Sequence, residues 1–256
     1  MSIHPTAIIH PRAQLGADVN IGPYCIVGPG VRLGDRTSLL GHVFMDGNTT
    51  VGDDSVIFPF ASIGTQTQDL KFKGGQTRVE IGGHTTLREY VTVNSGTNEG
   101  DVTRVGSGCH IMAYCHVAHQ CAVGDGVIMS NLATLAGHVI IEDRAVIGGM
   151  TGIHQFVRVG TLSMVGACSK ATMDIPPYMI ADGNPAALHG PNNVGLQRNN
   201  VSAESRTLIK EAYRILCRSG LSTSQALERI NAEIAPCAEI DNLVAFIKAS
   251  ERGIAK

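Results

Sequence analysis

Residues 105–171 read VGSGCHIMAYCHVAHQCAVGDGVIMSNLATLAGHVIIEDRAVIGGMTGIHQFVRVGTLSMVGACSKA. An apolar residue recurs there at every sixth position: Val105, Ile111, Val117, Val123, Met129, Leu135, Ile141, Ile147, Ile153, Val159 and Val165. A period of six fits neither an amphipathic helix nor an alternating strand. It is typical of the hexapeptide repeat of a parallel β-helix, in which each repeat contributes one short strand and one turn.

The same phase extends back to the N-terminus. It comprises Ile3, Ile9, Leu15, Ile21, Val27, Leu33, Leu39, Met45, Val51, Ile57 and Ile63, and then Ile81, Leu87 and Val93. Asp69, Gly75 and Glu99 break it and mark two polar segments, 64–80 and 94–104. These segments predict loops that leave an otherwise continuous coil over residues 1–185, and long loops on a rigid solenoid often carry function. The 30 glycines suit the many tight turns of such a coil.

Composition and charge exclude several classes of protein. The 20 Lys and Arg residues nearly balance the 22 Asp and Glu residues, and no dense basic run suggests a nucleic-acid surface. No stretch approaches the ~18 apolar residues of a membrane span. The N-terminal MSIHPTAIIHP lacks the charged and apolar regions of a signal peptide, so we expect a cytoplasmic protein.

Four of the seven cysteines share one place in the repeat. Cys25, Cys109, Cys115 and Cys121 each lie two positions before the recurring apolar residue. We therefore predict small buried residues there, rather than a disulfide framework or metal ligands.

The repeat fades after Ala171, and a Pro-Pro pair with several Gly and Asn residues follows it. We therefore place a boundary between residues 185 and 186 and expect a C-terminal α-helical domain that covers the open end of the coil. Ser202 and Asp241 are candidate helix N-caps, and Gly220 lies just past the end of the first helix. The predicted helices are 203–218, 224–235 and 241–251.

Three of the histidines are expected to lie together at one corner of the coil, where they could act in acid–base catalysis. If one coil contains three hexapeptides, His119, Gly137 and Gln155 stack directly, because they are eighteen residues apart. His138 and His154 then lie in the neighbouring columns of the same corner. A neutral imidazole accepts a proton from an alcohol near pH 7, and a glycine N–H stabilises an oxyanion. We interpret five further histidines as hydrogen-bonded turn residues: His4, His10, His42, His84 and His110.

Several motifs resemble those of the UDP-N-acetylglucosamine O-acyltransferase family, which catalyses the first step of lipid A synthesis. They are QDLK (68–71), CHVAHQC (115–121), TLAGH (134–138), IGGMTGIHQF (147–156) and PPYMIADGNP (176–185). The resemblance covers nearly the whole chain. It implies a left-handed coil and a homotrimer with active sites between subunits. It also implies transfer of a (3R)-3-hydroxyacyl chain from acyl carrier protein to the 3-hydroxyl of UDP-N-acetylglucosamine, without a bound cofactor or metal.

The resemblance also implies roles for individual residues. His119 matches the general base and Gly137 the oxyanion-hole amide. The residues that match sugar and phosphate contacts are Gln68, Asp69 and Lys71. The other matched residues are His116, His138, His154 and Gln155, which line the substrate site, and Asn192 and Arg198, which contact the nucleotide and the carrier protein.

The chain departs from the family pattern at four places. Gln120 follows the base where an acidic residue is usual, NSGT (94–97) replaces HRGT, and Asn199 replaces an arginine. Ala167 occupies the position that limits acyl length, where glycine is frequent. The role of the missing acid is therefore weakened or transferred to another group, and the extra methyl predicts a shorter acyl chain.

Four other functions remain open at this level. A trimeric zinc hydratase of the γ-carbonic-anhydrase type also uses histidines on such a coil, and the acceptor is alternatively a 3-amino sugar nucleotide. A non-catalytic scaffold predicts that the loops and histidines are dispensable. The related N-acyltransferase of the same pathway carries an N-terminal uridine-binding domain, whereas the repeats here begin at Ile3.

Overall fold

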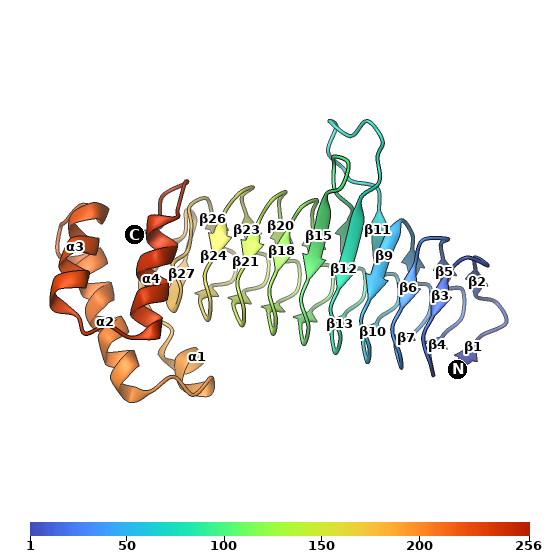
Figure 1. Ribbon diagram of the computed structural model, residues 1–256, viewed down its shortest axis with the longest axis horizontal. Helices are drawn as coiled ribbons and strands as arrows, with labels where there is room; N and C mark the ends of the chain where they lie inside the picture. Colours follow the sequence, from blue (N-terminus) through green and yellow to red (C-terminus); the bar gives the residue numbers. More distant parts are fainter.

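The computed structural model describes residues 1–256 as a long three-sided coil with a small helical domain at its C-terminal end (Figure 1). Three parallel sheets, which we call A, B and C, form the sides, and each coil contributes one strand to each sheet. The architecture is a left-handed parallel β-helix, as expected from the sequence. No helix is long and apolar enough to cross a membrane.

The strands are mostly two residues long because every hexapeptide turns a corner. Sheet A contains, in order, β1 (Ser2–Ile3), β4 (Asn20–Ile21), β7 (Ser38–Leu39), β10 (Val56–Ile57), β13 (Thr86–Leu87), β16 (His110–Ile111), β19 (Ile128–Met129), β22 (Val146–Ile147), β25 (Met164–Val165), β27 (Met179–Asp182) and β28 (Ala187–Pro191). Sheet B contains β2 (Ile8–Ile9), β5 (Ile26–Val27), β8 (Phe44–Met45), β11 (Ser62–Thr65), β14 (Thr92–Asn94), β17 (His116–Val117), β20 (Thr134–Leu135), β23 (Gly152–Ile153) and β26 (Lys170–Ala171). Sheet C contains β3 (Gln14–Leu15), β6 (Arg32–Leu33), β9 (Asn48–Val51), β12 (Arg78–Ile81), β15 (Val102–Val105), β18 (Ala122–Val123), β21 (Ile140–Ile141) and β24 (Arg158–Val159).

The register confirms three hexapeptides per coil. Val117 pairs with Leu135, and Leu135 pairs with Ile153. The inward residues of the repeat are buried along most of the coil, and the four cysteines predicted to be buried are buried and free. Ile3 is an exception, with 44 % of its surface exposed, because β1 is the edge strand of sheet A.

The many glycines suggest that glycine occupies the left-handed positions at the corners of the coil, but this is usually not so. The residue with a left-handed backbone is usually not glycine; Tyr24 (φ 56°) and His138 (φ 62°) are examples. Such a conformation costs a non-glycine residue roughly 1–2 kcal/mol. The rings of Tyr24 and His138 stack on the next coil, with centroids 5.0 and 4.6 Å from those of His42 and Phe156. Glycine is needed instead where coils approach closely: a Cβ on Gly148 would lie 2.5 Å from the backbone nitrogen of Ala167.

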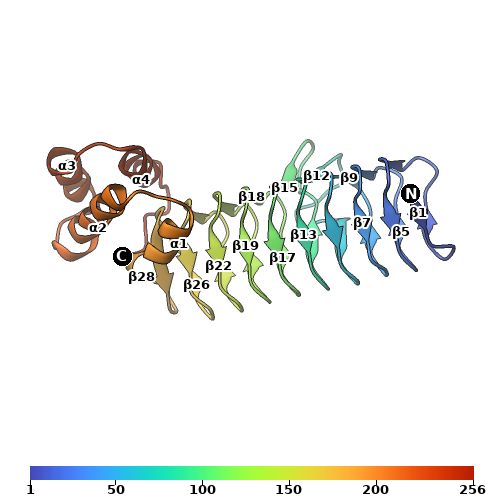
Figure 2. The same cartoon turned by 90° about the horizontal axis from the view of Figure 1, so that it is seen from below.

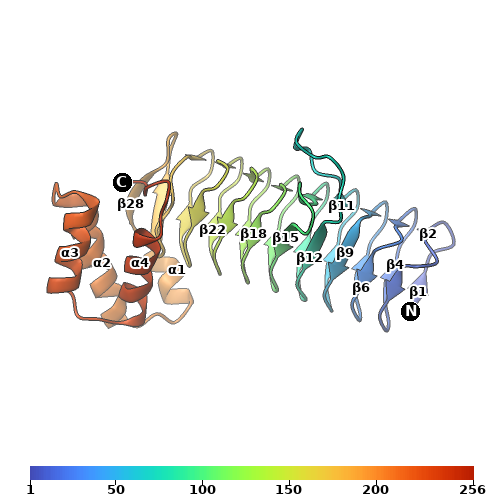
Figure 3. The same cartoon turned by 45° about the horizontal axis from the view of Figure 1, so that its top comes forward.

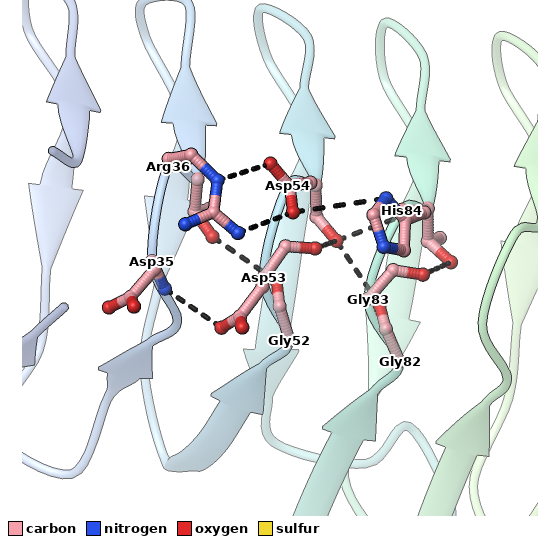
Figure 4. A network of polar contacts seen from close by, with 11 residues as sticks. Asp35, Arg36, Gly52, Asp53, Asp54, Gly82, Gly83 and His84 are labelled. Atoms are coloured by element: carbon pink, nitrogen blue, oxygen red, sulfur yellow. Dashed lines mark hydrogen bonds and ion pairs between the residues drawn. The ribbon is translucent and has the colours of Figure 1, made fainter. Parts of the chain in front are cut away.

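Aspartates bridge successive coils at the corner between sheets C and A (Figure 4). The N–H of Asp35 donates to Asp53 Oδ1 at 2.9 Å, and the N–H of Asp125 donates to Asp143 Oδ1 at 2.8 Å. Arg36 pairs with Asp54 at 2.7 Å beside this column. The carboxylates thereby satisfy N–H groups that the short strands leave without a partner.

Both long loops leave the coil at the corner between sheets B and C, next to one another (Figures 1 and 3). The first connects β11 to β12 and the second connects β14 to β15. The loops are shorter than predicted, because β12 and β15 have four residues each and pair with each other along their full length.

The C-terminal region begins with a β-hairpin and continues as helices. Strand β28 pairs antiparallel with β27 and extends sheet A past the predicted boundary at 185/186. The helices are α1 (Asn193–Arg198), α2 (Ala203–Arg218), α3 (Thr223–Glu233) and α4 (Ala238–Lys248). Helix α2 has the predicted bounds and its predicted N-cap, since Ser202 accepts from the N–H of Ser205. The prediction of Asp241 as an N-cap is wrong, because α4 begins earlier and Cys237 occupies that position.

Candidate active site

The three residues predicted to stack do so at the corner between sheets B and C. The N–H of His138 donates to the carbonyl of His119 at 3.0 Å, and the N–H of Phe156 donates to the carbonyl of Gly137 at 3.2 Å. The imidazole of His119 packs directly on Gly137. A Cβ at Gly137 would lie 2.2 Å from Cε1 and 2.5 Å from Nε2 of the ring, so any larger residue at this position would displace the imidazole.

The N–H of Gly137 is buried and donates to no protein acceptor. Gly137 lies two residues after an inward position of the repeat. At the corner between sheets C and A, the N–H groups at the equivalent position donate to aspartates of the next coil. The N–H of Ser107, for example, donates to Asp125 Oδ1 at 2.7 Å. The residue that lies above Gly137 is Gln155, and it leaves this N–H unpaired. Because buried donors are nearly always paired, the group is suited to a ligand oxygen.

The first loop completes a cleft of about 590 Å³ over this corner. Its lining residues are Gln68, Asp69, Leu70, Lys71, Ala118, His119, His138, Gln155 and Phe156. The structure therefore brings together seven of the predicted site residues, counting Gly137 beneath the His119 ring. Phe156 was not predicted. It stacks on His138 with ring centroids 4.6 Å apart, and the edge of His138 faces His119 at 5.3 Å.

Asp69 is held in its ionised form. The N–H of Lys71 donates to Asp69 Oδ1 at 3.0 Å, and the hydroxyl of Thr97, from the second loop, donates to Oδ2 at 3.3 Å. These bonds, together with the nearby His119 and the Lys71 ammonium, hold the pKa of this carboxyl below its usual range. Asp69 is thus an acceptor fixed at the entrance of the cleft.

The two histidines around His119 favour their neutral forms. Burial, and then the charge of His119, lower the pKa of both His116 and His138. His116 lies on β17 and does not line the cleft; its Nδ1 shares a hydrogen bond of 2.7 Å with the hydroxyl of Thr92. It therefore lies on the outer face of sheet B, next to the corner.

Gln120 and Asp101 are the site residues that the motifs alone do not place. Gln120 Oε1 hydrogen-bonds His119 Nδ1, and Gln120 Nε2 donates to Asp101 Oδ2 in the second loop. The position of Gln120 was visible as a departure from the family pattern. Its link to Asp101 was not, because it depends on the path of a loop.

Four predicted residues lie away from this cleft in the single chain. His154 is exposed and turned outside it. Asn192 is buried and caps α1, donating to the carbonyl of Leu162 at 2.9 Å and accepting from the N–H of Gly195 at 3.1 Å. Arg198 is exposed in α1, at the helical end of the coil (Figure 2). Ala167 lies at the corner between sheets A and B. None of the four lines the cleft of the single chain.

No group of three or more His, Cys, Asp or Glu side chains within the chain is arranged to hold a metal. The clustered histidines are instead paired with one another, with Gln120 or with Thr92.

Comparison with known proteins places this chain in a family. Residues 174–255 match the model described as UDP-N-acetylglucosamine O-acyltransferase, domain 2, and residues 1–35 and 103–137 match the bacterial transferase hexapeptide model. The chain is 47 % identical over 255 residues to the acyl-[acyl-carrier-protein]–UDP-N-acetylglucosamine O-acyltransferase of Thermodesulfovibrio yellowstonii, with 99 % of each chain covered.

Solved structures agree over the whole length. LpxA from Acinetobacter baumannii superposes with a TM-score of 0.96 at 42 % identity, covering 100 % of both chains. LpxA from Bacteroides fragilis, a UDP-N-acetylglucosamine acyltransferase, gives 0.97 at 40 % identity and covers 99 % of this chain and 100 % of its own. These likenesses do not support the zinc hydratase, the scaffold or the 3-amino acceptor. The chain belongs to the acyl-[acyl-carrier-protein]–UDP-N-acetylglucosamine O-acyltransferase family.

Proposed function

We propose that His119 is the general base of this family's reaction, the transfer of an acyl chain from acyl carrier protein to UDP-N-acetylglucosamine in the first step of lipid A synthesis. Nε2 of His119 takes the proton of the 3-hydroxyl while that oxygen attacks the carbonyl carbon of the thioester. The Gly137 N–H stabilises the tetrahedral oxyanion. When the intermediate collapses, the C–S bond breaks and the imidazolium returns its proton to the leaving thiolate.

The observation that carries this proposal is the contact of His119 with Gly137. The imidazole lies on a residue whose N–H is buried and unpaired. A base and an oxyanion donor thus belong to adjacent coils of one rigid corner, as acyl transfer to an alcohol requires.

The loop over the cleft suits the acceptor. The fixed carboxylate of Asp69 and the amide of Gln68 are placed to hold sugar hydroxyls, and Lys71 supplies a cation for the diphosphate. We further propose that the donor carries a (3R)-3-hydroxyacyl chain. Because the acyl group arrives already activated as a thioester, the reaction needs no bound cofactor. We place it in the cytoplasm.

The assay that tests this function offers 3-hydroxyacyl carrier proteins of graded chain length together with UDP-N-acetylglucosamine or its 3-amino analogue. We expect an ester product with the hydroxyl acceptor, identified by mass spectrometry. Absence of transfer from every donor to either acceptor would refute the proposal.

We propose that the active unit is a homotrimer, which would bring Asn192, Arg198 and Ala167 of one chain toward the cleft of another. An exposed apolar ridge at the corner between sheets A and B supports this. Its stacked rings are Tyr24, His42, Phe60, Tyr90 and Tyr114, with centroids 4.7–5.0 Å apart, and it continues as Leu132 and Met150. Ridges of this kind commonly mark protein interfaces.

Light scattering is expected to give three times the 27.0 kDa mass of one chain. Replacing Tyr90 with glutamate puts a charge in the middle of the ridge and is expected to shift the mass toward that of the monomer. A monomeric wild-type chain would contradict the proposed assembly.

We propose that Ala167 limits acyl length, and that Ala167→Gly shifts the preference toward longer chains. Space for about one methylene is worth ~1–3 kcal/mol, so the ratio of kcat/KM for long over short donors is expected to rise roughly 10-fold or more. Ala113→Gly, at the same corner several coils earlier, is the matched control and should leave the ratio unchanged. Equal ratios in both variants would show that Ala167 does not contact the chain.

A further inference from the structure

Gln120 connects the imidazole of His119 to a carboxylate on a different segment of the chain. Gln120 Oε1 lies on His119 Nδ1 and Gln120 Nε2 donates to Asp101 Oδ2. The backbone of Gln120 is also fixed, because its N–H donates to Thr103 Oγ1 at 3.0 Å and its φ of 53° is left-handed. The amide side chain is thus held at the backbone and at both of its polar atoms.

We propose that Asp101 is a positioning residue for His119 and acts through Gln120, so that the three side chains form a hydrogen-bonded relay. The inference rests on the role of His119 proposed above and extends it to two residues that carry no acid–base chemistry themselves. In this arrangement the second loop supplies the orienting carboxylate, and the side-chain amide of Gln120 lies between that carboxylate and the imidazole.

The physical argument concerns which way the amide of Gln120 points. An ionised carboxylate only accepts hydrogen bonds, so Asp101 must face the NH₂ group of Gln120. The carbonyl oxygen of Gln120 then faces His119, and it can pair only with a protonated Nδ1. The remaining nitrogen, Nε2, is left as the acceptor, which is the tautomer that a general base needs.

A glutamine without Asp101 does not impose this tautomer. With the amide reversed, its NH₂ group would donate to an unprotonated Nδ1, and Nε2 would carry the proton. The charge of Asp101 makes that arrangement unfavourable, because it would place two acceptor oxygens against each other. Asp101 itself is held by the second loop, where it accepts from the N–H of Asn98 at 2.6 Å and from that of Thr97 at 3.2 Å.

Other charged and titratable groups also surround His119. They are Asp69 and Lys71 from the first loop, His138 from the next coil and His116 from the same coil. None of them hydrogen-bonds Nδ1 of His119, so the relay is the hydrogen-bonded connection between this nitrogen and a charged group. The carboxylate of Asp101 favours the imidazolium that forms when the hydroxyl proton is transferred.

The test is a double-mutant cycle on the trimeric enzyme, with steady-state kinetics over pH. Asp101→Asn removes the charge but keeps the shape, and it weakens the hydrogen bond that orients the amide of Gln120. We expect kcat to fall about 10–100-fold, the usual loss when an orienting partner is removed, with KM for UDP-N-acetylglucosamine nearly unchanged. The acidic limb of the pH–rate profile should move to lower pH, because the imidazolium loses a stabilising charge.

The cycle separates the relay from a merely structural role in the loop. Gln120→Met breaks the connection, so in that background Asp101→Asn should have no further effect on kcat. The exchange Gln120→Glu with Asp101→Asn moves the charge next to His119, and it should restore kcat to within a few-fold and return the acidic limb toward its original pH. Glu99→Gln is the matched control in the same loop; Glu99 accepts from the N–H of Gln76 at 2.8 Å, and we expect normal kinetics.

Two results would overturn the proposal. One is wild-type kcat and pH dependence in Asp101→Asn. The other is an equal loss of kcat from Asp101→Asn with Gln120 or Met at position 120, since Asp101 would then act only on the loop. If His119→Ala abolishes turnover while the relay variants do not affect it, the base assignment stands and the relay alone fails. If His119→Ala retains turnover, the base assignment itself fails.

Discussion

His119→Ala is expected to lower kcat by a factor of ~10²–10⁴, the usual contribution of a positioned general base. The alanine removes the only imidazole that lies on the Gly137 amide. The inward column of the coil is untouched, so the proposed trimer and the unfolding temperature should change little. Single-turnover rates with saturating donor and acceptor would measure the chemical step directly.

His84→Ala is the matched control for this variant. His84 is an exposed corner histidine between sheets C and A, near Asp54 at 3.9 Å (Figure 4), and it lies outside the cleft. Its loss should leave kcat unchanged. Turnover by His119→Ala within a few-fold of wild type would show that another group removes the proton.

Gly137→Ala keeps the N–H at position 137 but displaces the base, so it is expected to lower kcat by a factor on the order of 10²–10³, within the range for loss of a positioned base. The new Cβ would lie 2.2 Å from Cε1 of His119, so the ring must leave its place over the amide. Gly137 is absent from the residues with positive φ, so alanine brings no backbone strain. The cost therefore falls on catalysis rather than on stability, and kcat should fall while the unfolding temperature is nearly kept.

Gly152→Ala provides the comparison, because a Cβ there would meet no atom within 4 Å and the residue has no positive φ. We expect that variant to unfold at the wild-type temperature. In the double variant Gly137→Ala/His119→Ala, the new methyl has no imidazole to displace. A kcat below that of His119→Ala would therefore mean that the methyl also obstructs the oxyanion position. A Gly137→Ala enzyme with wild-type kcat would show that catalysis does not require the His119 ring to lie directly on residue 137.

The coil could be predicted because its information is local. Every six residues supply one inward side chain, and the eighteen-residue spacing of His119, Gly137 and Gln155 follows from three such units per coil. The exit of both loops beside His119 is also implied by the phase of the repeat. For the same reason, the four buried cysteines could be recognised from their place in the hexapeptide.

The parts that escaped prediction depend on contacts between distant segments. Asp101 reaches Gln120 only through the fold of the second loop. The motif alone gives no sign that both polar atoms of the Asn192 side chain already have partners. Its Nδ2 donates to the carbonyl of Leu162, and its Oδ1 accepts from the N–H of Gly195 in α1. Helix α1 has six residues, of which only Leu196 is buried, so it lacks the periodicity that revealed the longer helices.

The two ends of the coil differ in how well they are covered by other elements, so we expect unfolding to begin at one of them. Strands β27 and β28 and the helices close the C-terminal end, whereas β1 ends sheet A with Ile3 44 % exposed and Ile8 nearby 65 % exposed. Each coil hydrogen-bonds only to its neighbouring coils. We therefore expect local unfolding to begin at the N-terminal coil and to proceed along the axis one coil at a time. His119 follows β17, the sixth strand of sheet B. We therefore expect the first coils to open transiently while the catalytic corner stays folded.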